Sequence, residues 1–164
     1  FEPHTELLIR GKAGKDVEFG HMLELQQIEG GLITNYTVHE KRPAEPPLLE
    51  KAIARHTELF GHAPEVCASD KGFYSQEAVK KVADLGVEKV CVPKKGRRND
   101  EEETREKSHW FKLAQAFRAG IEGTISVLKR VFGLCRCLRE GFQHFESWAG
   151  TGVLAHNLVL LARA

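Results

Sequence analysis

The sequence contains no long apolar run, no large excess of either charge and only four cysteines. No stretch approaches the roughly 20 apolar residues of a membrane-spanning helix, so we expect no transmembrane segment. No basic stretch followed by an apolar one opens the chain, so nothing in it indicates a secretory leader. The cysteines lack the paired spacing of structural zinc sites and suit a reducing cytoplasm, and we expect Cys67 and Cys91 to be buried.

The composition is that of one folded domain. Of the 164 residues, 41% are apolar, which is enough for a buried core. The net charge of +1 hides an asymmetry, because residues 1–104 carry 15 basic and 19 acidic side chains, whereas residues 105–143 carry 8 and 3. The basic segment suits a polyanionic partner such as a nucleic acid. An exposed helix face is the alternative, and on charge alone it is the favoured interpretation.

The first part of the chain has the pattern of a hairpin followed by a helix. We interpret residues 1–16 as an irregular lead-in. Apolar and β-branched residues in 17–28 and 32–38 predict two antiparallel strands, joined by a turn at Gly30 and Gly31. Pro46 fits the first turn of a helix, which we expect to end at Gly61.

A strand–helix–strand unit follows. Residues 65–69 and 87–92 are short apolar strands, and Ser75 is suited to cap the helix between them. Strands joined by such a helix are normally parallel. We interpret the charged residues 94–104 as a loop. The apolar spacing beyond them predicts one long helix over 105–132, with Ala114, Phe117 and Leu128 on its buried face, and a last helix over 144–162 with Leu154 and Leu158 on its own.

Two acidic residues stand where a ligand can bind. Asp70 follows a strand directly, and ligands of open α/β sheets bind at the carboxyl ends of strands, although an ordinary turn aspartate is the alternative. Glu122 lies beside the apolar face of the long helix, in a polar stripe that also contains Gln115, Arg118, Ser126 and Lys129. Charge pairing one helical turn apart is the alternative there. Together, the two carboxylates could converge on a divalent cation, and the nearby cations could bind DNA phosphates.

With these residues the chain resembles the C-terminal part of insertion-sequence DDE transposases. The resemblance rests on the segments GKAGKDVEFGHMLEL, ASDKGFYS, VCVPKK and FRAGIEGTISVLKR, and on LAHNL in the final helix. In these families the second acid lies in a D-[KR]-G-[FY] segment, which Asp70 to Phe73 match. The last acid lies in a helical Y-x2-R-x3-E-x6-K pattern, which Arg118, Glu122 and Lys129 match, with Gln115 in place of the Tyr.

The resemblance implies a fold, an activity and a set of roles. The implied fold is α/β, an RNase H-like mixed sheet of an antiparallel hairpin and parallel strands flanked by helices, as a single catalytic domain over residues 1–164. The implied activity is Mg²⁺- or Mn²⁺-dependent phosphodiester cleavage at transposon ends and strand transfer into target DNA. Asp70 and Glu122 would be catalytic metal ligands, and Lys71, Arg118 and Lys129 would contact DNA. The implied partners are double-stranded DNA and further copies of the chain, in the bacterial cytoplasm and not at a membrane.

One departure from the family leaves alternatives open. The family has a first Asp on the opening strand of its fold, and Glu2, Asp16 and Glu18 are poorly placed to replace it. We therefore expect the chain as given to lack that first strand and its metal ligand. A catalytically inactive remnant that still binds DNA is the alternative function. A nuclease of the same fold without strand transfer is a third.

Overall fold

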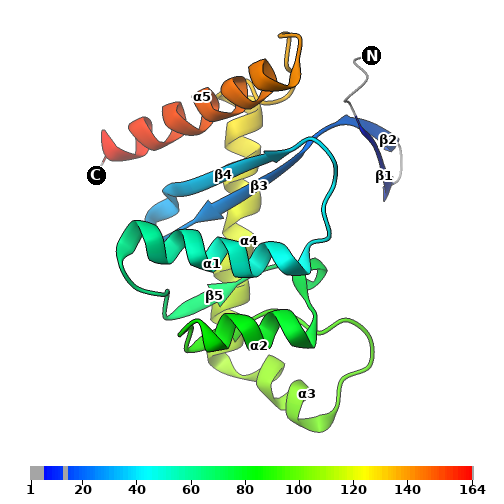
Figure 1. Ribbon diagram of the computed structural model, residues 1–164, viewed down its shortest axis with the longest axis vertical. Coiled ribbons are helices and arrows are strands. Elements are labelled where there is room, and N and C mark those ends of the chain that lie inside the picture. Colours follow the sequence, from blue (N-terminus) through cyan, green and yellow to red (C-terminus); the bar gives the residue numbers. More distant parts are fainter. Residues whose placement is uncertain (1–5, 13–14, 164) are drawn as a thin grey trace. The chain divides into compact units, whose positions relative to one another are not determined.

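The structure is a computed structural model (Figure 1), and it describes residues 6–12 and 15–163. The fold is α/β, as predicted, with antiparallel hairpins, a parallel strand pair and five α-helices among these residues. Hydrogen bonds join the described strands into three two-stranded sheets. The chain divides into two compact units, residues 44–123, here called the parallel-strand unit, and residues 1–43 with 124–164, here called the hairpin unit.

The parallel-strand unit is built around strands β5 (Val66–Ala68) and β6 (Lys89–Cys91). They run parallel with Cys67 opposite Val90, which confirms the predicted pairing. The other elements of this unit are helices, namely α1 (Pro46–Phe60), the short 3-10 helix η2 (Lys71–Phe73), α2 (Gln76–Asp84), α3 (Asp100–Lys107) and, as far as Gly123, α4 (His109–Arg130).

Helices cover both faces of the parallel pair. Val90 and Val92 belong to a buried cluster that α1 and α2, which lie side by side in Figure 1, complete with Leu49, Ile53 and Val82. Cys91, between the two valines, packs on the other face with Phe111 and Ala114 of α4. Successive strand side chains point to opposite faces, so a strand buried on both sides needs an uninterrupted apolar run, which residues 90–92 supply at the end of β6.

Capping residues set the ends of α1 and α2. The Ser75 hydroxyl accepts a hydrogen bond from the Ala78 amide at 3.0 Å, as a helix N-cap does, which confirms the prediction for Ser75. Helix α1 ends at Gly61, also as predicted, and the Gly61 amide donates to the Thr57 carbonyl at 2.8 Å.

The charge run after β6 is partly helical, so the prediction of a loop over 94–104 is wrong for its second half. Asn99 and Glu102 form a reciprocal capping box, with both hydrogen bonds at 2.8 Å, and α3 begins at Asp100. At Ser108 the backbone is extended, so the predicted single helix over 105–132 is two helices, α3 and α4. Helix α3 has no buried residue, and a prediction from apolar spacing therefore missed it.

The hairpin unit contains the predicted antiparallel pair. Strands β3 (Met22–Gln27) and β4 (Ile33–His39) pair antiparallel, but the strand predicted over 17–28 begins only at Met22. Between them, the turn η1 (Glu29–Gly31) contains two glycines at positive φ, Gly30 and Gly31, a conformation that other residues rarely adopt. A second antiparallel pair, β1 (Glu6–Lys12) with β2 (Lys15–Gly20), replaces most of the predicted irregular lead-in over 1–16, whose other residues lie outside the described ones.

Two side chains of α5 (Phe142–Leu161) bind the backbone at the start of β4. Asn157 Oδ1 accepts from the Ile33 amide at 3.0 Å, and Asn157 Nδ2 donates to the Ile33 carbonyl at 2.7 Å. His156 Nε2 lies 3.2 Å from the Gly31 carbonyl oxygen. Ile33 also packs with Leu128 and Val153 in the core of this unit. The LAHNL segment therefore fixes α5 on the hairpin.

Two predicted buried helix faces are only partly buried. In α4, Ala114 and Leu128 are buried as predicted, but Phe117 is 45% exposed. In α5, Leu154 and Leu158 are more than half exposed, and small residues such as Ala149 are buried instead. Periodicity locates an apolar stripe on a helix but does not say which part of it a neighbouring element covers. None of the described helices is both long enough and apolar enough to cross a bilayer.

Replacing Asn157 by Ala removes both side-chain bonds to Ile33. We expect the free energy of unfolding to fall by about 2 kcal/mol, since each net hydrogen bond contributes about 1 kcal/mol. Urea unfolding followed by circular dichroism measures this change. Leu158→Ala is the matched control, because this neighbouring side chain is exposed and its loss should cost about 0.5 kcal/mol or less. Equal losses in the two variants would contradict the role given to Asn157.

Candidate active site at the ends of the parallel strands

Asp70 lies just beyond the carboxyl end of β5. It follows Ser69 and begins the 3-10 turn η2, and its own backbone is extended. Its side chain is 62% exposed. The structure therefore puts Asp70 at the end of the parallel pair, as the sequence predicts and where ligands of α/β sheets commonly bind.

Arg118 of α4 joins Asp70 and Glu122. Its Nη1 donates to Asp70 Oδ1, and its Nη2 donates to Glu122 Oε1 at 3.4 Å. Arg118 is 48 positions from Asp70 in the chain and one helical turn from Glu122. The guanidinium is largely covered, with a side chain only 21% exposed, whereas the Glu122 side chain is 70% exposed. Folding thus brings the two predicted acids into contact with the same guanidinium group.

The electrostatics of this cluster favour a cationic ligand. Two carboxylates near one another repel, and the guanidinium of Arg118 offsets that repulsion. Because both carboxylates are exposed, the ion pairs contribute little to stability. Their remaining oxygen atoms are open to solvent and can therefore reach a ligand.

The two carboxylates fit a divalent metal ion by their chemistry. Carboxylate oxygens are hard ligands, and Mg²⁺ is usually held by one or two protein carboxylates together with water and phosphate oxygens. Asp70 and Glu122 supply two such groups on one solvent-open surface. Across residues 6–12 and 15–163, no group of three acidic, histidine or cysteine side chains is gathered as in a complete metal cage.

The predicted DNA-contacting lysines have different positions. Lys71 is the residue after Asp70, in η2, and is exposed. Lys129 lies beyond Gly123, in the hairpin unit, where it lines a cavity of about 520 Å³ together with Arg42 and Trp148. Arg118, the third predicted DNA contact, is the one that the structure brings to Asp70.

Three acidic residues were candidates for the first acid of the family pattern. Glu2 lies outside the described residues. Asp16 and Glu18 lie within β2 of the hairpin unit, and neither ends that strand.

Three further side chains contact the Asp70 loop or the strand ends. Sequence reasoning gave Glu45 and Lys95 no place at the site, and it placed Gln115 in the polar stripe of the long helix without giving it a role. Glu45 packs so closely on Gly72 that a Cβ at position 72 would lie 1.7 Å from Glu45 Oε2. Lys95 Nζ donates to the Gly72 carbonyl at 2.8 Å. Gln115 reaches the ends of both parallel strands. The glycine in the segment Lys71–Phe73 was the available signal, since it marks a close approach to the backbone.

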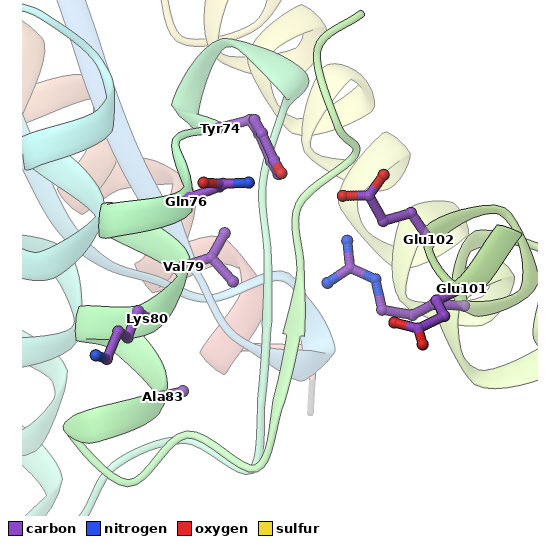
Figure 2. Close-up of a pocket in the computed structure, with 8 residues that line it drawn as sticks. Tyr74, Gln76, Val79, Lys80, Ala83, Glu101 and Glu102 are labelled. Atoms are coloured by element: carbon purple, nitrogen blue, oxygen red, sulfur yellow. The ribbon is translucent and has the colours of Figure 1, made fainter. Parts of the chain in front are cut away.

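A separate hollow of about 380 Å³ lies between α2 and α3 (Figure 2). Tyr74, Gln76 and Lys80 line one side, and Glu101 and Glu102 of α3 line the other. Lys94 Nζ hydrogen-bonds both Glu102 oxygens at 2.7 and 2.6 Å and lowers the pKa of that carboxyl. Neither Asp70 nor Glu122 lines this hollow, so it is distinct from the acidic cluster.

Comparison with known proteins identifies the family. A family model described as "Transposase DDE domain" matches residues 24–158, most of the chain, and the chain therefore belongs to this family. No curated protein matches the chain, and no solved structure matches it. The observed α/β architecture is consistent with the RNase H-like fold of such transposase domains. Membership implies a transposase function, a DNA substrate and the use of divalent metal ions.

Replacing Gly72 by Ala forces the Glu45 carboxylate off the Asp70 loop. Because the crowded atoms are the end of a flexible side chain that can move, we expect the free energy of unfolding to fall by no more than about 1 kcal/mol. In a Glu45→Ala background the same replacement should cost almost nothing, because the crowded group is gone. Gly120→Ala is the control, since no atom lies within 4 Å of its added Cβ and a helix gains up to about 1 kcal/mol from the change. An equal cost at position 72 with and without Glu45 would refute the contact.

Proposed function

We propose that Asp70 and Glu122 are two of the catalytic metal ligands of a transposase that cleaves DNA at transposon ends and joins it to target DNA. The observation that carries the proposal is the Arg118 guanidinium, which contacts both carboxylates. Asp70 and Glu122 are far apart in the chain, and nothing in their local structure requires them to be close. Their contact with the same guanidinium therefore supports a shared site.

In this proposal the residues of the chain have separate tasks. Asp70 and Glu122 bind the cation, Mg²⁺ or Mn²⁺, through oxygen atoms that are open to solvent. The ion, when bound, would polarise the phosphate and stabilise the leaving oxygen. Water attacks phosphorus at the transposon end and a 3′-hydroxyl leaves. This hydroxyl then attacks a phosphodiester of the target, the target P–O3′ bond breaks, and a 3′-hydroxyl of the target strand leaves with the proton. Arg118, whose guanidinium has five N–H donors, holds the carboxylates and can also contact a DNA phosphate.

The proposal extends to the whole chain. The family match runs from residue 24 to residue 158 and so includes parts of both compact units, which supports one catalytic domain formed by residues 1–164. Because a transposon has two ends, we expect the active complex to hold more than one copy of the chain. We expect it to act in the bacterial cytoplasm, on the DNA of the nucleoid.

Changing either proposed ligand should abolish cleavage. In the protein that contains this chain, Asp70→Asn and Glu122→Gln should each slow cutting of transposon-end DNA by more than about 100-fold, beyond the usual cost of disturbing a ligand's hydrogen-bond partner. The assay follows strand cleavage on a gel with Mg²⁺ or Mn²⁺. Asp84→Asn, an exposed carboxylate at the end of α2, is the matched control and should cut at the parental rate. Parental rates in both ligand variants would disprove the site.

Removing the proposed phosphate contacts should weaken DNA binding in a salt-dependent way. Lys71→Ala and Lys129→Ala should each lower the slope of log affinity against log salt by about one, because each removes one phosphate contact. Gel shifts with excess duplex DNA at several salt concentrations give the slope. Lys51→Ala, at an exposed position of α1, is the control and should leave the slope unchanged. Slopes that match the parent in both site variants would exclude these contacts.

A DNA-binding remnant without cleavage activity is the second candidate. The observation that favours it is that Asp70 and Glu122 have no third metal-binding side chain beside them among the described residues. Salt-sensitive DNA binding without any cleavage would support the remnant. Nicked DNA without joined products would instead indicate a nuclease of the same fold.

A further inference from the structure

Gln115 links helix α4 to the ends of both parallel strands. Its side-chain nitrogen Nε2 lies 3.1 Å from the Cys91 carbonyl oxygen and 3.3 Å from the Ser69 carbonyl oxygen, and donates to both. It also lies 3.3 Å from Cys91 Sγ. A primary amide has two N–H donors, so one side chain can satisfy both carbonyls.

The two carbonyls lie at the ends of the two strands. Cys91 is the last residue of β6, and its carbonyl also accepts a hydrogen bond from the Ser69 amide at 3.1 Å. Ser69 follows the last residue of β5, and its carbonyl belongs to the peptide that leads into Asp70. The bond from Gln115 to Ser69 therefore holds the backbone directly before the acidic side chain.

Apolar packing alone does not fix the helix at this position. Phe111 and Ala114 pack on Cys91, but burial of apolar surface has no directional preference and tolerates small shifts of a helix. Hydrogen bonds depend steeply on distance and angle. The amide of Gln115 therefore adds directional contacts between α4 and the strand ends, beside the bond from Cys91 Sγ to the Phe111 carbonyl. Arg118 and Glu122 follow Gln115 by three and seven residues on the same face of α4.

We propose that Gln115 is a positioning residue of the active site, which holds α4 in the register that brings Arg118 and Glu122 to Asp70. This role rests on the proposed function only for its catalytic consequence. The geometric part, that Gln115 sets the approach of positions 70 and 122, stands without it. A glutamine fits the task because it offers two donors, whereas a glutamate of the same length offers none.

A cross-linking experiment tests the geometric part without any metal. Cysteines replace Asp70 and Glu122, serine replaces Cys135 and Cys137, and a short bifunctional maleimide joins the two new thiols. Cys91 is fully buried, and burial raises the pKa of the Cys67 thiol to about 12, so neither competes at neutral pH. We expect a high yield with Gln115 and a severalfold lower yield with Gln115→Met.

Two further variants make the cross-linking result decisive. Gln115→Glu keeps the length of the side chain but has no donor, so its yield should also fall. Lys112→Met, exposed on α4 one turn earlier, should retain the full yield. Yields equal to that of Gln115 in the Met and Glu variants would overturn the proposal. Loss of the folded circular dichroism spectrum in both would overturn it too, since Gln115 would then act on stability and not on position.

Manganese binding tests the functional part. Electron paramagnetic resonance of Mn²⁺ with the full chain should give an affinity that Gln115→Met lowers by roughly 10- to 100-fold, as for other residues that orient metal ligands. Lys112→Met should bind like the parent, and Asp70→Asn should not bind. If Asp70→Asn binds Mn²⁺ like the parent, the proposed metal site is wrong. The cross-linking result still tests the positioning role of Gln115 in that case. If Asp70→Asn loses binding and Gln115→Met keeps it, the metal site stands and the positioning role fails.

Discussion

The packing of α4 across one face of the parallel strand pair is the constraint on which the candidate site depends. Cys91 is completely buried, and it meets Phe111 and Ala114 at the first turns of this helix. The small size of Cys91 and Ala114 allows a close approach, since protein interiors are packed without spare volume. When these turns pack on the strand pair, the helical repeat places Arg118 at the end of the strands, where it contacts Asp70.

The cluster at that end is poorly explained by stability. Asp70 and Glu122 are mostly exposed, and exposed ion pairs contribute between nothing and about 1 kcal/mol. Two acids beside one base also leave a net negative charge in place. Several contacts nevertheless hold this loop, including the approach of Glu45 to Gly72 and the bond from Lys95. A cluster of side chains that adds little to the stability of the fold, but whose loop is held by several contacts, is typical of a ligand site.

Sequence reasoning succeeded where the signal was local. The hairpin turn at Gly30, the cap at Ser75 and the acids at strand end and helix face all follow from short patterns, and the structure has each of them there. It failed where a structural feature depends on residues far away in the chain, or on polar contacts without an apolar pattern. Helix α3 has no apolar period, so its capping box was missed, and the exposure of Phe117 depends on what other elements cover. The contacts of Gln115 required both strands to be in place.

The charged segment between β6 and α4 neutralises itself. Residues 94–107 contain six basic and five acidic side chains. Glu102 pairs with Lys94 at 2.6 Å, and Glu106 pairs with Arg98 at 2.7 Å. Hydrogen bonds from their lysine partners lower the pKa of Glu102 and of Glu103. The segment therefore has a net charge of only +1, and it changes little the potential that an approaching polyanion meets.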